Sequence, residues 1–211
     1  MTFYNVGKRL IDIVGGLIGL VVFSPFILIS LLWVKLVSPE GPVFADTHNR
    51  VGKDGKEFKM YKVRSMIPNG QKWLEDRPEW LERHKANGYK LDPDPRLIKG
   101  AKWLRKSSID EMPQFINVIL GDMSLVGPRA YFPFELKEQM EKYPETKKFV
   151  DQFLSTKPGI TGPWQVGGRA EIPFPKRVVM DAEYAQRKSL LYDLQILIKT
   201  PFAVLSQRGS F

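Results

Sequence analysis

Two acidic residues that could do chemistry stand side by side at Asp110 and Glu111, in the stretch SSIDEMPQF. Ser108 precedes Glu111 by three residues, which is the spacing of a capping box and predicts that a helix begins there. In the first turn of that helix both carboxylates lie beside free backbone N–H groups, where an anion or a metal ion can share a ligand site. The helix dipole alone stabilises such carboxylates by about 0.3 to 1 kcal/mol, so a purely structural role is the competing interpretation.

Arginines bracket the acid pair, with Arg105 before it and Arg129 after it. Arginine binds phosphate through two N–H groups at once, and Mg²⁺ takes carboxylate oxygens while it bridges the phosphates of a substrate. Together these residue types predict a phosphoryl-transfer site, in which catalysis is mostly positioning and charge neutralisation. An aspartate can also be the nucleophile and form an acyl phosphate. A glycosidase fits less well, because its two carboxylates face each other across a sugar.

The composition limits the classes of partner and the compartment. The 211 residues are enough for one sizeable domain with attachments, and 32 Lys and Arg residues against 23 Asp and Glu residues give a net charge of +9. Such an excess predicts anionic partners, which are nucleic acid, lipid phosphate or a phosphorylated small molecule. The chain has no cysteine, which excludes disulfides, thiolate metal sites and a cysteine nucleophile. Its two histidines argue against a histidine-rich metal centre.

The N-terminal region contains an apolar run from Ile13 to Val34 without a charged residue. As a helix this run is about 33 Å long, close to the ~30 Å hydrocarbon core of a bilayer. It is longer than the apolar part of a secretory signal, and no A-x-A cleavage site follows it. It is also longer than most single helices buried in a soluble domain, which is the remaining alternative. The run therefore predicts insertion into a membrane.

Proline divides this membrane segment at Ser24-Pro25. Because proline removes a helical hydrogen bond, the segment either spans the bilayer with a kink or bends back as a re-entrant helix. Basic residues lie on both flanks, among them Lys8, Arg9 and Lys35, and the positive-inside rule places both flanks in the cytoplasm. The basic flanks therefore favour the re-entrant alternative.

The rest of the chain has the pattern of a mainly helical α+β domain. Asp54-Gly55 is a hairpin-turn signal between two extended stretches, and Pro78 suits the first turn of a short helix. Glycines and prolines predict a loop over residues 155–169. An apolar stripe at helical spacing runs through the last helix, which Pro201 is expected to end, and we assign it to the core in preference to the membrane interface. The expected elements are strands at 43–51 and 57–66 and helices at 78–86, 97–106, 109–120, 134–143 and 180–200.

Four stretches of the chain resemble the monotopic phosphoglycosyl transferases, bacterial sugar transferases that start glycan assembly on a polyprenyl phosphate. They are the Ser-Pro of the apolar segment, RVGKDGKEFKMYKVRSM at 50–66, DPRLIKGAKWLRKSSIDEMPQFINVILGDMSLVGPRA at 94–130, and KPGITGPWQVGGR at 157–169. The resemblance covers nearly the whole chain, and the third stretch is its most specific part. In that family the Ser-Pro breaks a re-entrant membrane helix, which implies such a break at Ser24 and Pro25.

The resemblance implies a reaction in two steps. Asp110 would attack the β-phosphate of a UDP-sugar, release UMP and carry the phosphosugar as a covalent intermediate. A polyprenyl phosphate, such as undecaprenyl phosphate, would then attack that intermediate and give a polyprenyl-diphosphate-sugar. Glu111 would assist as a base or as an orienting group, and a Mg²⁺ cofactor would be bound by Asp110 near the diphosphate.

The resemblance also implies a set of residues that bind the substrate or its phosphates. They are Lys62, Arg105, Arg129, Gln165, Arg169, Asp181 and Arg208. Among them, Asp181 matches a family aspartate near the active site. The chain departs from the family pattern at Val63, where phenylalanine is usual, and at Pro163 and Gly167, which bear on sugar or nucleotide choice.

The sequence therefore predicts an enzyme at the cytoplasmic face of a bacterial inner membrane. Residues 1–37 would form a basic lead and the re-entrant helix, and residues 38–211 a catalytic domain with interfacial helices. The expected partners are a UDP-sugar, a polyprenyl phosphate and membrane lipids, with a homodimer as an option and no nucleic acid.

Two alternatives stay open at this point. A membrane-anchored nucleic-acid-binding protein would use the basic run from Arg50 to Arg64 as a phosphate-binding stripe, and it would have no use for Asp110. A scaffold subunit of a glycan-assembly complex would have no turnover.

Overall fold

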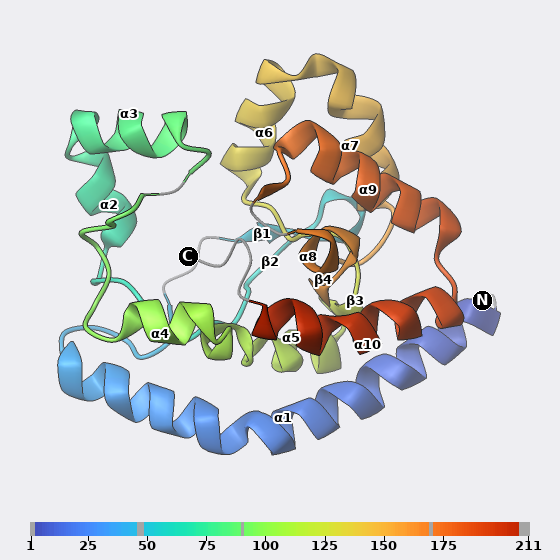
Figure 1. Cartoon of the computed structure of the whole chain (residues 1–211), viewed down its shortest axis with the longest axis horizontal. Coiled ribbons are helices and arrows are strands. Elements are labelled where there is room, and N and C mark those ends of the chain that lie inside the picture. The colour runs from blue at the N-terminus through green and yellow to red at the C-terminus, as the bar shows by residue number, and fades with distance from the viewer. Residues whose placement is uncertain (1–2, 46–48, 90, 169–170, 207–211) are drawn as a thin grey trace.

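The computed structural model describes residues 3–45, 49–89, 91–168 and 171–206. Within these residues the chain is mostly helical, with short strands and 3₁₀ turns (Figure 1). The α-helices are α1 (Phe3–Val37), α2 (Gly70–Glu75), α3 (Pro78–Ala86), α4 (Ala101–Lys106), α5 (Gln114–Leu120), α6 (Pro133–Lys142), α7 (Lys147–Leu154), α8 (Pro163–Gly167), α9 (Phe174–Arg187) and α10 (Leu190–Leu205). The strands are β1 (Arg50–Val51), β2 (Glu57–Phe58), β3 (Ser124–Val126) and β4 (Gly159–Thr161), and the 3₁₀ helices are η1 (Lys53–Gly55), η2 (Ile109–Glu111) and η3 (Pro144–Thr146).

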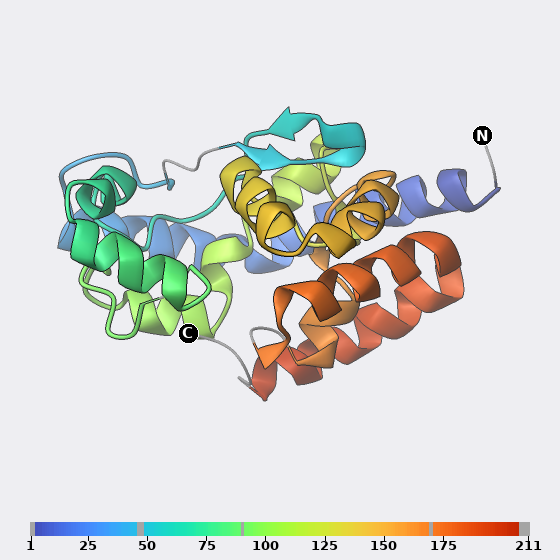
Figure 2. The same cartoon turned by 90° about the horizontal axis from the view of Figure 1, so that it is seen from above.

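Helix α1 runs along one edge of the molecule, and α4, α5 and α10 all lie on the same side of it (Figure 1). Helices α6, α7 and α9 lie farther from α1, beyond that row. Seen from above, α2, α3 and α4 gather at the end of α1 where that helix finishes (Figure 2). The molecule is therefore a helical body built on one side of a long helix.

Helix α1 is continuous, as the apolar run predicts, and it bends along its length (Figure 1). Pro25 lies inside it and has no N–H for the carbonyl of Val21, four residues earlier. The hydroxyl of Ser24 donates a hydrogen bond to that carbonyl instead, at 2.8 Å. The proline opens the hydrogen-bond ladder and the serine satisfies the freed carbonyl, so the helix continues with a bend.

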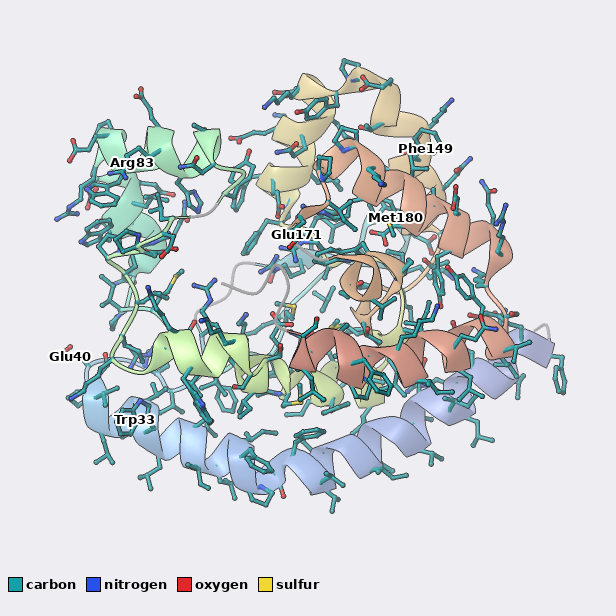
Figure 3. All side chains as sticks on the ribbon, viewed as in Figure 1. Trp33, Glu40, Arg83, Phe149, Glu171 and Met180 are labelled. Carbon is teal, nitrogen blue, oxygen red and sulfur yellow. The ribbon has the colours of Figure 1, made fainter. Side chains whose placement is uncertain are left out.

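The outer face of α1 is apolar, and its side chains project away from the other elements (Figure 3). Val21, Leu28 and Leu36 on this helix are 71%, 65% and 69% exposed. Among the described residues, α1 alone is long and apolar enough to cross a membrane by length and composition. On the inner face, a Cβ at Gly19 would lie 2.5 Å from the ring of Phe115, so glycine lets α5 pack closely on α1.

Both ends of α1 are tied to the body of the protein. Near its start, Lys8 forms an ion pair of 3.0 Å with Asp193 of α10. Near its end, the indole of Trp33 donates to the carbonyl of Lys99 at 3.0 Å, just before α4 (Figure 3). Val34 is fully buried in a core cluster that α4 shares. The same body therefore contacts both ends of the apolar helix.

Over the described ranges, the core consists of three clusters of buried apolar side chains. One joins α5, β3, α9 and α10 around Val118 and Tyr184, and a second joins α6, α7 and α9 around Val178. The third joins the end of α1 to α4 around Leu104. Because α5 and α4 flank the acid pair in the chain, two of these clusters fix its position.

The hairpin predicted at Asp54 is confirmed, although its strands are shorter than predicted. β1 and β2 pair antiparallel, with Arg50 opposite Phe58. The turn is η1, in which Asp54 takes a φ of 56°. An isolated bridge between Phe44 and Val63 continues the pairing. The segment after β2 is therefore held extended against the residues that follow α1.

The loop predicted over 155–169 is wrong, because this stretch contains a strand and a helix. Strand β4 pairs parallel with β3, with Ser124 opposite Gly159, and α8 follows it. The two segments approach closely because glycine stands on both sides: a Cβ on Gly159 would lie 2.1 Å from the backbone nitrogen of Gly127. This pairing places the residues after β3 beside those after β4.

The single helix predicted over 180–200 is two helices. Helix α9 ends at Arg187, and Ser189 caps α10 by accepting a hydrogen bond from the N–H of Tyr192 at 3.2 Å. The cap explains the break, because a serine in extended conformation starts a new helix more readily than it continues an old one. Pro201 does not end α10, which runs on to Leu205.

The predicted apolar stripe of α10 is only partly in the core: three of its five residues are exposed and two are half-buried. Helix α10 packs on the body through the face where Asp193 and Ile196 are each 2% exposed. Of the predicted stripe, Leu191, Leu194 and Ile198 are 67%, 52% and 59% exposed, whereas Leu190 and Leu197 are half-buried and Leu197 packs against a core cluster. Phe202 and Leu205 extend the exposed apolar face, at 70% and 78%. An apolar stripe has the same spacing whether it faces a protein core or a lipid surface, and sequence spacing alone therefore does not separate the two.

Candidate active site

Asp110 and Glu111 lie in η2, one turn before α5 begins at Gln114. The predicted capping box is wrong: Ser108 has a φ of 58°, in the left-handed region, and its side chain makes no capping hydrogen bond. Pro113 explains why one helix over 109–120 does not form, because it has no N–H to donate to the carbonyl four residues earlier. The acid pair therefore lies outside the α-helix that was expected to carry it.

Lys62 contacts both carboxylates. Its Nζ lies 3.0 Å from Oδ2 of Asp110 and 2.9 Å from Oε1 of Glu111. Only the contact with Glu111 has hydrogen-bond geometry, so Oδ2 of Asp110 has no hydrogen-bond donor among the described residues. The Asp110 side chain is 2% exposed, whereas that of Glu111 is 41% exposed. Asp110 is thus a buried carboxylate with an uncommitted oxygen beside a cation, which suits a nucleophile.

Burial and the ion pairs shift the pKa of all three groups. Burial raises the pKa of Asp110 above its ordinary value, although Lys62 opposes the shift. The charge of Lys62 lowers the pKa of Glu111. Burial acts to lower the pKa of Lys62, but its two carboxylate partners outweigh burial and raise that pKa. Lys62 and Glu111 are therefore both charged at neutral pH, and Asp110 is the carboxyl that keeps a proton more readily.

Asn117 of α5 holds the segment that carries Lys62. Its fully buried side chain accepts a hydrogen bond from the N–H of Tyr61 at 2.9 Å and donates one to the backbone carbonyl of Lys59 at 2.8 Å. On the other side of Lys62, the N–H of Val63 donates to the backbone carbonyl of Asp110 at 2.9 Å. These bonds fix the backbone on both sides of the lysine, and the sequence analysis missed Asn117.

The segment after β3 places Arg129 near the acid pair. Its backbone N–H donates to Oδ2 of Asp181 on α9 at 3.2 Å. Its guanidinium carbon lies 5.3 Å from the ring centroid of Trp164 on α8. Lys62 and, more weakly, Arg129 lower the pKa of Glu111, which shows that both cations act on the exposed carboxylate.

Asp181 has no exposed surface, and its Oδ1 has no hydrogen-bond partner among the described residues. Burial raises its pKa to about 7, against the opposing effects of the Arg129 backbone N–H and the charge of Arg177. A carboxyl group with that pKa exchanges a proton near neutral pH. The structure therefore brings Asp181, which the resemblance placed near the active site, against Arg129.

The other predicted site residues lie in different places. Arg105 lies on α4. Its charge acts to lower the pKa of Asp110, although this effect is smaller than those of burial and of Lys62. Gln165 lies on α8 and has a buried Oε1 without a partner among the described residues. Arg169 and Arg208 lie outside the described residues. Ser24 and Pro25, the predicted break of a membrane helix, lie inside α1, which bends but is continuous, as described above.

Unpartnered polar atoms mark the same site. Within the described part of the chain, eight buried side-chain nitrogen or oxygen atoms have no hydrogen-bond partner. They belong to Arg50, Asp110, Arg129, Tyr131, Trp164, Gln165, Arg177 and Asp181. Ring contacts, hydrogen bonds and charge effects link all of these residues except Gln165 to one another and to Glu111, and Gln165 follows Trp164 on α8. Because a buried polar group without a partner is costly, this concentration indicates a site built for a polar ligand.

Several of these residues were missed by the sequence analysis. Arg177 precedes Asp181 by four residues, which places both on one face of α9, and this spacing was the available signal. Trp164 lies inside a stretch whose family resemblance was noted, but no role was given to it. Arg50 likewise lies inside a resembling stretch and in the basic run, but no role in the site was given to it. Tyr131 carried no signal, because its position in the site depends on pairing between distant segments.

The two arginines at the ends of the basic run from Arg50 to Arg64 are buried. Arg50 and Arg64 are only 8% and 3% exposed. The guanidinium of Arg64 donates to the hydroxyl and the carbonyl of Ser38 at 2.9 Å and 2.6 Å, which ties the exit of α1 to this segment. These two arginines therefore serve the fold and the site, whereas Lys53, Lys56 and Lys59 of the same run are exposed.

A magnesium ion fits the donor chemistry of the acid pair. The described residues contain no group of three or more His, Cys, Asp or Glu side chains that could hold a metal ion. Mg²⁺ commonly binds through one or two carboxylates, while substrate phosphates and waters supply its other ligands. Oδ2 of Asp110, which lacks a hydrogen-bond donor, is the oxygen available to such an ion.

Comparison with known proteins gives a consistent set of matches. A family model described as "Bacterial sugar transferase" matches residues 3–207. The undecaprenyl-phosphate galactose phosphotransferase of Salmonella typhimurium is 39% identical over 212 residues, which cover 97% of this chain and 41% of that protein. The exopolysaccharide production protein ExoY of Rhizobium meliloti is 38% identical over 211 residues, covering 98% and 89%. The UDP-glucose:undecaprenyl-phosphate glucose-1-phosphate transferase of Escherichia coli is 36% identical over 212 residues, covering 97% and 41%. The chain thus spans about two fifths of the first and third of these relatives and about nine tenths of the second.

Proposed function

Because the chain belongs to the bacterial sugar transferase family, we propose that it transfers a sugar phosphate from a UDP-sugar to a polyprenyl phosphate, yielding a polyprenyl-diphosphate-sugar. Two relatives support this proposal, since one is an undecaprenyl-phosphate galactose phosphotransferase and the other a UDP-glucose:undecaprenyl-phosphate glucose-1-phosphate transferase. One structural observation carries it: buried Asp110 has an oxygen that lies 3.0 Å from the ammonium of Lys62 and accepts no hydrogen bond from any described residue.

In the first half-reaction, a carboxylate oxygen of Asp110 attacks the β-phosphorus of the UDP-sugar. A bond forms between that oxygen and the phosphorus, and the bond from the β-phosphorus to the bridging oxygen breaks. UMP leaves with the bridging oxygen, and the enzyme carries an aspartyl phosphosugar. Lys62 and Arg129 offset the negative charge that the carboxylate meets as it approaches the phosphate.

In the second half-reaction, a phosphate oxygen of the polyprenyl phosphate attacks the same phosphorus. A new diphosphate bond forms, and the bond between the phosphorus and the Asp110 oxygen breaks. The carboxylate returns to its starting form, still beside Lys62. Both half-reactions thus use one nucleophile and one set of phosphate-binding cations.

Glu111 acts as an orienting group in this proposal and not as a general base. Its hydrogen bond of 2.9 Å to Lys62 holds the ammonium beside Asp110. The lowered pKa that Lys62 produces makes Glu111 a weak base at neutral pH, which disfavours proton abstraction. Asp110 and Glu111 would hold a Mg²⁺ ion. When bound, this ion would neutralise negative charge on the diphosphate.

We place the protein at the cytoplasmic face of the bacterial inner membrane, with α1 inserted as a re-entrant helix. The exposed apolar face of α1 supports insertion, and the exposed stripe of α10 supports contact with the same lipid surface. Lys8 near the start of α1 and Trp33 near its end both contact one folded body. A helix whose two ends bind the same body returns to the side from which it entered.

Turnover tests the proposal directly. The full chain in lipid nanodiscs, with undecaprenyl phosphate and Mg²⁺, is incubated with UDP-glucose, UDP-galactose and UDP-N-acetylgalactosamine in turn. We expect UMP and a lipid-linked sugar diphosphate in equal amounts from at least one donor. Release of neither product from any UDP-sugar would favour a scaffold without turnover.

A further inference from the structure

Three arginines in the site have buried Nε atoms without a hydrogen-bond partner in the described part of the chain: Arg50, Arg129 and Arg177. We call them the arginine track. No ion pair joins any of them to a carboxylate among the described residues. Arg50 and Arg177 each donate one hydrogen bond to a backbone carbonyl, at 3.1 Å and 3.0 Å. Most of the N–H groups of the track are therefore left for an anion.

Aromatic rings hold the three guanidinium groups in place. The guanidinium carbon of Arg50 lies 3.2 Å from the ring centroid of Phe132. Those of Arg129 and Arg177 lie 5.3 Å and 4.9 Å from the ring centroid of Trp164, which both arginines share. A ring contacts a guanidinium through its face and takes none of its N–H groups. The site thus orients its cations without using the donors that would bind phosphate.

The track has a direction relative to the acid pair. Arg129 and Arg50 act, after Lys62, on the pKa of Glu111, and so lie at the acid-pair end. Arg50 donates to the carbonyl of Ala130, the residue next to Arg129, and Arg129 shares the ring of Trp164 with Arg177. Arg177 lies on α9 and donates to the carbonyl of Ile172, so it is at the far end of the track.

We propose that the arginine track binds the two phosphates of the nucleotide-sugar donor in order, and that Arg177 binds the phosphate of the leaving UMP. This inference rests on the proposed function and adds a residue to it. The β-phosphate must lie within reach of Asp110, and Arg50 and Arg129 are the cations of the track at that end. The α-phosphate then lies along the track, and it gains negative charge when the bond to the β-phosphorus breaks. Arg177 stabilises that charge on the departing phosphate.

The substitution R177Q tests the assignment, with K176Q as its matched control. Both variants remove one positive charge from adjacent positions of α9, but Lys176 is exposed and faces solvent. We expect R177Q to weaken binding of UMP to the full chain in nanodiscs by about tenfold to a hundredfold, as loss of a charge-assisted hydrogen bond implies. K176Q should bind UMP as the unchanged protein does.

Kinetics locate the effect in one half-reaction. For a reaction that passes through a covalent intermediate, kcat/KM for the donor reports the first half and kcat/KM for the acceptor reports the second. R177Q should lower kcat/KM for the UDP-sugar by a similar factor and leave kcat/KM for undecaprenyl phosphate unchanged. An equal loss in both values would contradict a role confined to the leaving group.

The outcomes separate this inference from the proposed function. If the unchanged protein turns over and R177Q binds UMP as tightly as K176Q does, the assignment of Arg177 is overturned and the proposed function stands. If the protein binds UMP through Arg177 but transfers no sugar, the nucleotide site stands and the proposed function fails. If R177Q does not fold, R177K takes its place, because lysine keeps the positive charge but lacks the planar guanidinium group of arginine. A UMP affinity of R177K equal to that of K176Q would overturn the assignment.

Discussion

The ammonium of Lys62 lies 3.0 Å from Oδ2 of Asp110, yet the contact lacks the geometry of a hydrogen bond. The lysine therefore lowers the electrostatic cost of an ionised Asp110 without occupying the lone pair that would attack phosphorus. Glu111 takes the aligned hydrogen bond, at 2.9 Å, and so sets where the ammonium sits. Asp110 is thus the nucleophile, Lys62 stabilises its charge, and Glu111 positions Lys62.

The substitution K62M should lower kcat/KM for the UDP-sugar by at least about a hundredfold and move the acid limb of its pH profile upward. Lys62 opposes the effect of burial on Asp110, so its loss raises the pKa of that carboxyl further. Because only ionised Asp110 attacks, activity then appears at higher pH. Initial rates of UMP release from pH 5 to 9 measure this shift. K59M, at an exposed position on the same segment, is the control, and an acid limb at the same pH in K62M would refute the assigned role.

The substitution E111Q should move the acid limb in the opposite direction. The charge of Glu111 contributes to the raised pKa of Asp110, so its removal lowers that pKa. We expect a loss in kcat/KM of about tenfold to a hundredfold from the misplaced ammonium, with the acid limb displaced to lower pH. The same UMP-release assay measures both effects. Disappearance of the acid limb altogether would mean that Glu111 is the titrating base instead.

The substitution D181N should change how stability depends on pH. Burial raises the pKa of Asp181 from 3.8 to about 7, so between these values the folded protein holds a proton that the unfolded chain has released. Stability therefore falls as the pH rises through this window, by up to about 1.4 kcal/mol per pH unit. D181N does not lose stability in this way. The difference in stability between D181N and the unchanged protein should therefore grow in favour of D181N from pH 4 to pH 7 and then level off. Thermal unfolding across that range measures it.

The control for that comparison is D151N, at an exposed position on α7. Its unfolding midpoint should follow that of the unchanged protein at every pH. Parallel pH curves for D181N and the unchanged protein would show that Asp181 is ionised in the folded state over the whole range.

The two ends of α1 should be on one side of the membrane. The chain has no cysteine, so single cysteines at Phe3, which is 88% exposed, and at Lys53 report topology cleanly. Both should resist an impermeant thiol reagent in intact cells and react with it in inverted membrane vesicles. Reaction of only one of them in intact cells would show a helix that crosses the bilayer.

Turns and helix starts that depend only on neighbouring residues were predicted from the sequence. Asp54 makes a turn because its neighbours are extended and glycine follows it, and Pro78 begins α3 because its missing N–H has no partner in the first turn. The failure at Ser108 is also local, since the capping spacing was right and Pro113, five residues later, prevented the helix. Two strong short-range signals conflicted there, and the proline decided the outcome.

The parts that were not predicted depend on contacts between distant segments. The parallel pairing of Ser124 with Gly159 leaves no pattern in either segment alone, yet it brings Arg129 beside Trp164. Asn117 lies in an apolar stretch, and its role appears only when the segment of Lys62 packs against α5. Asp110 and Arg129 were found from residue types and family resemblance, whereas the arginine track required the folded chain.

The central claim is that Asp110 is the nucleophile, and a covalent adduct tests it most directly. The full chain is incubated with Mg²⁺ and a UDP-sugar labelled in the sugar, without any polyprenyl phosphate, then denatured, digested and mapped. The account predicts one equivalent of UMP and a labelled peptide with the modification on Asp110, which added polyprenyl phosphate removes and D110N lacks. Formation of lipid-linked sugar by D110N, or a label on any other residue, would contradict it.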